Sequence, residues 1–176
     1  MKQIYPAVCS LLLALTLSFH AGAQSYPSID KAALTSLISQ DKEHQYFAVF
    51  IFTNDCGGGM YMADLRKQID SITNGRTKFI FAQASRGKDR NAELEAAIKT
   101  FRVDKDEVYL INDATYKTDR KDAREQGMLF RNEVCFDCKF MEIGTVYKLI
   151  FDREQNLLYH GLSTDKKQLA AILRCK

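Results

Sequence analysis

Residues 45–60 read Gln-Tyr-Phe-Ala-Val-Phe-Ile-Phe-Thr-Asn-Asp-Cys-Gly-Gly-Gly-Met, and this stretch decides the fold of the chain. The unbroken apolar run Phe47–Phe52 predicts a strand that is buried on both faces of a sheet. After the glycines, apolar residues return at helical spacing at Met62, Leu65, Ile69 and Ile72. Cys56 is therefore predicted at a turn between a strand and a helix N-terminus, where partial positive charge stabilises a thiolate.

The first 23 residues have the pattern of a secretory signal peptide. A lysine at position 2 precedes an apolar segment around residues 8–17, and Ala21-Gly22-Ala23 supplies a small-x-small cleavage site. The apolar segment is shorter than the roughly 20 residues that a membrane span needs. The sequence thus predicts export to the periplasm or the medium, a single mature domain over residues 24–176, and no stable membrane span after cleavage.

The charge of the chain gives no sign of a nucleic-acid partner. The formal net charge is +3 and the 25 Lys and Arg residues are dispersed among 22 Asp and Glu residues. Strong, localised positive charge is what nucleic acids and acidic membranes attract. We therefore expect a protein partner rather than a nucleic acid.

Further strands and helices follow from the periodicity of the chain. A first helix is predicted over residues 26–40 with Ser28 as its cap, and the helix after Cys56 should end at Asn74-Gly75. The other predicted strands are residues 77–82, 108–111, 146–151 and 157–160, and the other helices are residues 91–101 and 164–175. Residues 117–126 read as an exposed helix or loop, and residues 128–141 have no clean period.

The order of these elements predicts an α/β fold. Alternating strands and helices imply right-handed parallel crossovers, and the last two strands are joined by a short turn and should form an antiparallel hairpin. The expected architecture is a three-layer sandwich, with a central mixed sheet and helices on both faces.

At this point the chain resembles the thioredoxin-like superfamily, especially exported redoxins of the thiol-disulfide and alkyl hydroperoxide reductase type. The resemblance rests on the strand-loop-Cys-helix unit of residues 47–72, the strand and acidic turn of residues 146–152, and the C-terminal helix. It implies a thioredoxin-like sandwich with a redox-active cysteine at Cys56 and no cofactor. The residues that it implies for substrate binding are Thr53, Gly57, Gly58, Gly59 and Thr145.

The chain departs from that family at its redox motif. The Cys-x-x-Cys of the family reads Cys56-Gly57-Gly58-Gly59 here, and the family's cis-proline is absent because residues 144–146 read Gly-Thr-Val. Thr53 lies three residues before Cys56, a spacing that peroxiredoxins share. Two hypotheses follow: thiol-based disulfide exchange or peroxide reduction through Cys56, or a redox-inactive thioredoxin-fold module that binds another envelope protein. Whether the protein is an enzyme stays open.

The other mature cysteines are Cys135, Cys138 and Cys175. The two-residue spacing of Cys135 and Cys138 is used by redox pairs and by structural sites. They are candidate resolving thiols for Cys56, or they belong to a structural disulfide, either with each other or with Cys175.

A third hypothesis is copper binding, because exported thioredoxin-like copper chaperones use Cys-x-x-x-Cys and a distant histidine. Cys56 and Met60 have the equivalent spacing here, and Met62 and His160 could add soft or imidazole ligands. Met60 and Met62 cannot both face the cysteine on one helix, and one of them is expected in the core. A strand histidine more often packs than binds a metal.

Overall fold

The computed structural model describes residues 26–53, 59–85, 89–118, 123–135, 138, 146–161 and 166–174. Its elements, in chain order, are β1 (Ser28–Ile29), α2 (Lys31–Gln40), β2 (Tyr46–Thr53), α3 (Gly59–Thr73), β3 (Thr77–Ala84), α4 (Arg90–Phe101), the 3₁₀ turn η1 (Lys105–Glu107), β4 (Val108–Ile111), α5 (Ala123–Val134), β5 (Tyr147–Asp152), β6 (Leu157–Gly161) and α6 (Lys166–Arg174).

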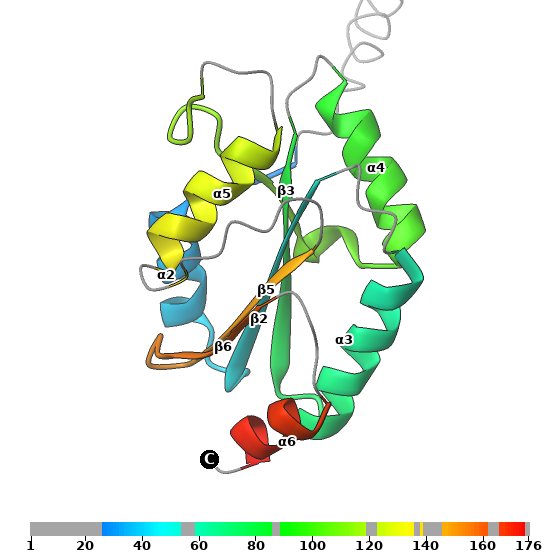
Figure 1. Ribbon diagram of the computed structural model, residues 1–176, viewed down its shortest axis with the longest axis vertical. Helices are drawn as coiled ribbons and strands as arrows, with labels where there is room; N and C mark the ends of the chain where they lie inside the picture. Colours follow the sequence, from blue (N-terminus) through cyan, green and yellow to red (C-terminus); the bar gives the residue numbers. More distant parts are fainter. Residues whose placement is uncertain are drawn as a thin grey trace, which may run out of the picture.

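One sheet of six strands forms the middle layer, in the order β1-β4-β3-β2-β5-β6. The first four strands in that order are mutually parallel, whereas β5 is antiparallel to β2 and β6 is antiparallel to β5. Helices α2 and α5 lie on one side of the sheet, and α3 and α4 lie on the other (Figure 1). These features confirm the three-layer α/β sandwich, with a central mixed sheet and helices on both faces, that the sequence predicts.

Strand β2 is central, and all eight of its residues are buried. Its side chains alternate between two hydrophobic clusters because successive residues of a strand point to opposite faces. Phe50 and Phe52 belong to the cluster under α3, α4 and α6, and Val49 and Ile51 belong to the cluster under α2 and α5. The unbroken apolar run of the sequence is thus the consequence of two covered faces.

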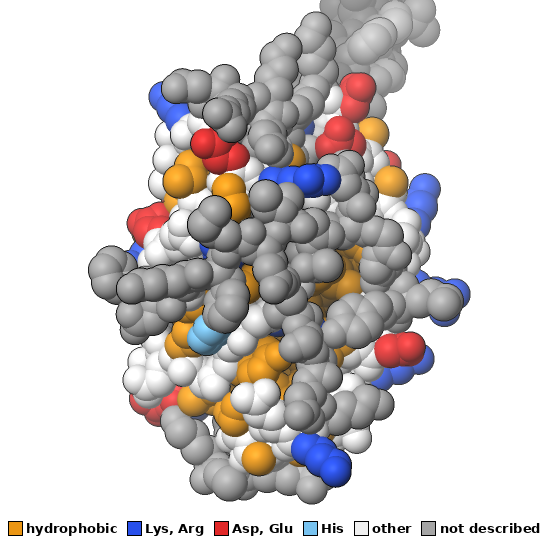
Figure 2. Space-filling view, in the orientation of Figure 1, with side chains coloured by type: hydrophobic (Ala, Val, Ile, Leu, Met, Phe, Trp, Pro, Cys, Tyr) orange, Lys and Arg blue, Asp and Glu red, His pale blue; other side chains and the backbone are white. Residues whose placement is uncertain are grey.

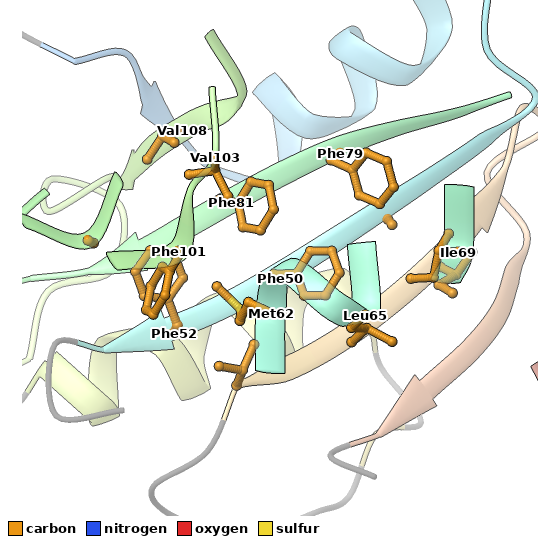
Figure 3. Close-up of a cluster of buried hydrophobic side chains, with 14 of the residues drawn as sticks. Phe50, Phe52, Met62, Leu65, Ile69, Phe79, Phe81, Phe101, Val103 and Val108 are labelled. Carbon is orange, nitrogen blue, oxygen red and sulfur yellow. The ribbon is translucent and has the colours of Figure 1, made fainter. Parts of the chain in front are cut away.

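Helix α3 docks on this strand through a stripe of side chains at helical spacing. Met62, Leu65 and Ile69 are almost fully buried and point toward the phenylalanines of β2 and β3 (Figure 3). The rings of Phe50 and Phe81 stack at 5.0 Å between centroids. This packing fixes α3, and with it the start of the helix, relative to the end of β2.

The start of the chain differs from the prediction. Ser28 does not cap a helix: it belongs to β1, which pairs with the end of β4. Helix α2 begins after Asp30, whose Oδ1 accepts a hydrogen bond from the Ala33 N–H at 2.9 Å. Asp30, two residues after Ser28, can cap a helix as a serine does. Ser28 and Ile29 pair with β4 instead of joining the helix.

Helix α5 lies where the sequence suggested an exposed or irregular segment. The buried residues of this helix are Gln126, Gly127, Phe130 and Arg131, whereas Leu129 is 40% exposed. The buried positions have helical spacing, but three of the four are polar or glycine. Hydrophobic periodicity therefore could not reveal which face of α5 packs on the sheet.

The remaining predicted elements are confirmed. Asn74 and Gly75 have positive φ angles of 53° and 72° directly after α3, as expected for a helix stop. The β5–β6 hairpin turns at Asp152, which accepts a hydrogen bond from the Asn156 N–H at 2.8 Å. Figure 2 shows hydrophobic side chains near the middle of one face and most visible charged side chains toward its margin.

Within the described residues, no helix has both the length and the apolar character that crossing a bilayer requires. The predicted signal peptide, residues 1–23, lies outside the described part of the chain.

Candidate functional site

The carboxyl ends of four parallel strands meet at one edge of the sheet, where open α/β sheets commonly bind ligands. Strand β2 reaches this edge at Thr53, and α3 begins at Gly59. Cys56, Gly57 and Gly58 lie between these two points and outside the described residues. Cys56 is thus three residues beyond the end of β2 and three residues before the first residue of α3.

The structure places three of the predicted residues in different settings. Thr53 is buried as the last residue of β2 and is register-paired with Ala84. Gly59 is the first residue of α3. Thr145 and the side chain of Met60 lie outside the described residues, so their predicted roles stay predictions. Met62, in contrast, is fully buried in the core, as the helical pattern required of one of the two methionines.

A buried glutamine connects the strands at the carboxyl edge. Gln126, in the first turn of α5, has no exposed surface. Its Oε1 accepts a hydrogen bond from the Ser85 N–H at 3.2 Å, and its Nε2 donates to Ile111 O at 3.3 Å and to the Asp113 carboxylate. The residues directly after β3 and β4 are thereby tied to the start of α5.

Two further contacts extend this network to α4. The Ser85 hydroxyl donates to the Glu93 carboxylate, and the Arg90 guanidinium pairs with the Asp113 carboxylate. Arg90 also donates to Ile111 O at 3.3 Å. The carboxyl edge of β3 and β4 is therefore a cross-linked polar rim rather than a set of independent loops.

Cys135 and Cys138 are joined to each other by a disulfide, with their Cα atoms 5.3 Å apart. Cys135 follows the last residue of α5, and both cysteines belong to the hydrophobic cluster under α2 and α5. They are 3% and 2% exposed, respectively. The alternative bridge to Cys175 that the sequence left open is not the pairing present here, because each cysteine forms one disulfide.

Beside this disulfide, polar side chains from α5, β5 and β6 meet. The Arg131 guanidinium lies over the Tyr147 ring, 5.0 Å from its centroid, and the Tyr147 hydroxyl is 3.1 Å from His160 Nδ1. Burial raises the pKa of Tyr147, and the nearby Arg131 cation partly offsets that rise. His160, predicted as a candidate copper ligand, is the exposed residue of the otherwise half-buried to buried strand β6 and contacts a tyrosine.

No cluster of three or more His, Cys, Asp or Glu side chains suited to a metal ion occurs in the described ranges. Of the four residues named for copper, Cys56 and the side chain of Met60 lie outside the described residues, Met62 is buried in the core, and His160 is exposed on β6. The structure therefore adds no described ligand to that set.

Sequence reasoning missed two features that surround the site, the Gln126 network and the Arg131–Tyr147–His160 cluster. Each draws its members from elements far apart in sequence, and no motif marks them. The local signal was weak: Gln126 and Arg131 each lie four residues from another buried residue of α5, Phe130 and Gly127 respectively, and a search for apolar periodicity does not register polar residues.

No family model and no curated protein matches the sequence. Among solved structures, the chain is similar to a thioredoxin-like protein from Aeropyrum pernix, with 14% identity, a TM-score of 0.48, and coverage of 77% of this chain and 80% of that one. It is also similar to the thioredoxin domain of a thiol-disulfide oxidoreductase from Bacteroides vulgatus, with 13% identity, a TM-score of 0.46, and coverage of 76% and 79%. StoA from Bacillus subtilis is a third similar structure, with 10% identity, a TM-score of 0.44, and coverage of 74% and 84%.

Proposed function

We propose that this chain is an exported thiol-based redox protein in which the Cys56 thiolate attacks a disulfide or a peroxide. The observation that carries the proposal is the position of Cys56 between the end of β2 and the N-terminus of the 15-residue helix α3. The helix N-terminus carries unpaired N–H groups and a partial positive charge, which lower a thiol pKa. Burial of β2 and of one face of α3 holds both ends of the Cys56 segment.

The cysteine inventory supports a free thiol at Cys56. Cys135 and Cys138 are bonded to each other, so Cys175 is the one other mature cysteine with which Cys56 could pair. Tyr46 donates a hydrogen bond from its hydroxyl to Leu173 O at 3.1 Å, which places the end of α6 near the start of β2. Thr53, the last described residue before Cys56, lies at the other end of that strand, about 23 Å away at the usual rise per residue, which disfavours a bridge between Cys56 and Cys175.

The missing second thiol of the local motif defines the mechanism. With glycine at position 59, the attack of Cys56 on a substrate disulfide forms a mixed disulfide and releases one substrate thiolate. A second thiol, supplied by the substrate or by a small thiol, must then release Cys56. Disulfide exchange of this kind predicts protein thiols or disulfides as partners, and Thr53, Gly57, Gly58, Gly59 and Thr145 as the surrounding contacts.

The test is the rate of alkylation of Cys56 by iodoacetamide as a function of pH, measured in a Cys175→Ser variant without reductant. The expected Cys56 pKa lies below the value of about 8.5 for a free thiol. The matched control is Cys175 in a Cys56→Ser variant, because Cys175 follows the C-terminus of α6, where a thiolate is disfavoured. A Cys56 pKa equal to or above that of Cys175, or a disulfide map that joins the two, would overturn the redox proposal and favour the binding module.

A further inference from the structure

The cation of Arg131 is buried without a carboxylate partner among the described side chains. Arg131 is 6% exposed, and its Nε and NH2 donate to the Asn132 side-chain oxygen at 3.2 and 3.0 Å. The Tyr147 ring covers the guanidinium, and the last turn of α5 favours a positive charge. Each of these contacts supplies only a neutral group or a partial charge. Burying a cation is costly in free energy unless a full negative charge lies close to it.

Backbone geometry places Arg131 next to Cys135. The Cys135 N–H donates to Arg131 O at 2.8 Å, so the helical hydrogen-bond pattern continues one residue past α5. Residues four apart in this pattern lie on the same helix face, with Cβ atoms about 5–6 Å apart. Both side chains are buried: Arg131 lies over the Tyr147 ring, and Cys135 belongs to the same hydrophobic cluster as Tyr147. Reduction of the disulfide would generate a thiolate beside the buried guanidinium.

We propose that Cys135–Cys138 is a second thiol–disulfide exchange site, reduced by small dithiols, and that Arg131 stabilises the thiolate that Cys135 becomes. This site is independent of Cys56. Cys135 and Cys138 lie in the cluster under α2 and α5, whereas α3, the helix that follows Cys56, packs on the opposite face of the sheet. Arg131 is a positioning residue in this proposal, because it acts through the charge of Cys135.

The reduction consumes one dithiol and releases one proton. A thiolate of the dithiol attacks Cys138 Sγ, the bond between the two cysteines breaks, and Cys135 leaves as a thiolate facing Arg131. The second sulfur of the dithiol then attacks the mixed disulfide, which closes the oxidised cyclic dithiol and releases Cys138. Of the two protons of the dithiol, one protonates Cys138 and the other enters solvent, so two electrons pass to the protein.

The surroundings of Cys135 other than Arg131 disfavour a thiolate, so the effect of Arg131 on the Cys135 pKa should be measurable. The C-terminal carbonyls of α5 disfavour a thiolate, as does burial. The titratable side chains described around this region are Tyr147 on β5, His160 on β6, Lys31 on α2, which lines a pocket with Val134, and Glu133 on α5, whose carboxylate accepts a hydrogen bond from Tyr116. Arg131 is the buried cation of this described set, whereas Lys31 is exposed, so removal of Arg131 should expose the unfavourable background.

The experiment uses a Cys56→Ser/Cys175→Ser variant, so that Cys135 and Cys138 are its only mature thiols. The protein is equilibrated with mixtures of reduced and oxidised dithiothreitol over a range of pH, trapped by alkylation, and weighed by mass spectrometry. Near-UV circular dichroism follows the fold of each sample. We expect reduction with the fold retained, and a break in the plot of midpoint potential against pH at the Cys135 pKa.

Replacing Arg131 should shift this break. Arg131→Met is expected to move it upward and to lower the equilibrium constant for reduction about tenfold at pH values above the original break, one pKa unit being a factor of ten. Arg131→Lys keeps the cation and should restore most of that constant, which also separates the charge effect from misfolding. Because Cys56 is absent, this outcome does not depend on the proposed function.

Two results would overturn the inference. One is reduction that occurs only in samples whose near-UV signal is lost, which would make the bridge purely structural. The other is an unchanged break in a folded Arg131→Met protein, which would show that the guanidinium does not face the thiolate.

Discussion

Two cysteine positions in this protein lie next to opposite ends of helices. Cys56 precedes the N-terminus of α3, and Cys135 follows the C-terminus of α5. In general, the backbone at a helix N-terminus stabilises a thiolate, whereas the backbone at a helix C-terminus destabilises it. The difference teaches that a cysteine-x-x-cysteine spacing alone does not define a redox site. The helix end that it occupies decides how much its neighbours must supply.

The surroundings of the two positions differ in the same sense. Strand β2, which precedes Cys56, ends at the carboxyl edge of the sheet, where Ser85, Asp113 and Gln126 form the polar rim. Cys135 and Cys138 lie in a hydrophobic cluster that also contains Tyr147, the residue under the Arg131 cation. In our two proposals, the first position attacks an external substrate and the second is reduced by small dithiols.

The largest expected difference between the two positions is in catalysis. Cys56→Ser should lower the rate of insulin reduction by dithiothreitol to the uncatalysed level, a loss of at least about 100-fold, because it removes the nucleophile. A Cys135→Ser/Cys138→Ser variant should keep its rate within about threefold of the unmodified protein. Equal losses in both variants would place the chemistry at the second position or in both.

The Gln126 network at the beginning of α5 should contribute more to stability than the Cys135–Cys138 disulfide at its end. Gln126→Leu leaves the Ser85 N–H without its buried acceptor and removes one of the two donors to Ile111 O, the other being Arg90, and it should lower the free energy of unfolding by about 2.5 kcal/mol. Urea denaturation measures this change. The control is Gln40→Leu, on the exposed face of α2, which should change stability by less than about 0.5 kcal/mol. Similar values for the two variants would contradict the role of the network.

Removal of the disulfide should cost less. Its loop is short, so the entropy that it removes from the unfolded chain corresponds to about 2 kcal/mol in the Cys135→Ser/Cys138→Ser variant. The same urea titration checks it, with the reduced wild-type protein as a second measurement of the same loss. A stability unchanged by both treatments would mean that the bridge does not constrain the end of α5.

The smallest expected effect lies at the amino end of the sheet, at Asp41, which follows α2. Burial would raise the pKa of Asp41, but hydrogen bonds from the His44 and Glu43 N–H groups, the Lys78 ammonium and the His44 ring hold this pKa well below its ordinary value. Asp41→Asn should therefore cost about 1 kcal/mol at neutral pH.

The pH dependence of that loss follows from the sign of the shift. A carboxyl whose pKa is lower in the folded state stabilises the fold above its unfolded pKa of about 3.9, and this contribution fades as the pH falls further. The difference between wild type and Asp41→Asn should thus be constant at neutral pH and shrink below about pH 4. The exposed Asp64→Asn is the control. A difference in the free energy of unfolding between the two proteins that grows as the pH falls would contradict this account. The cysteine titrations described above are carried out at higher pH and are unaffected.

Much of the sandwich followed from local pattern. The run Phe47–Phe52 required a strand covered on both sides, the stripe Met62, Leu65 and Ile69 required a helix, and Asn74-Gly75 required its end. The packing of α5 on the sheet was not predicted, because the buried face of this helix includes Gln126, Gly127 and Arg131. Strand β1 was not predicted because two residues are too few to show a hydrophobic period, and they form a strand by pairing with β4.

The sequence by itself determined the central strand, the helix after it, and the position of Cys56 in the connection between them, because hydrophobic periodicity is a local property of the chain. It also made Cys135 and Cys138 close enough to bond, but it left that pairing open beside Cys175. Tertiary structure decided the pairing, the position of Cys135 at a helix C-terminus, and its proximity to Arg131 and Tyr147. The physical reason is that charge, burial and cross-strand contact depend on which elements meet, and that is settled only when the sheet assembles.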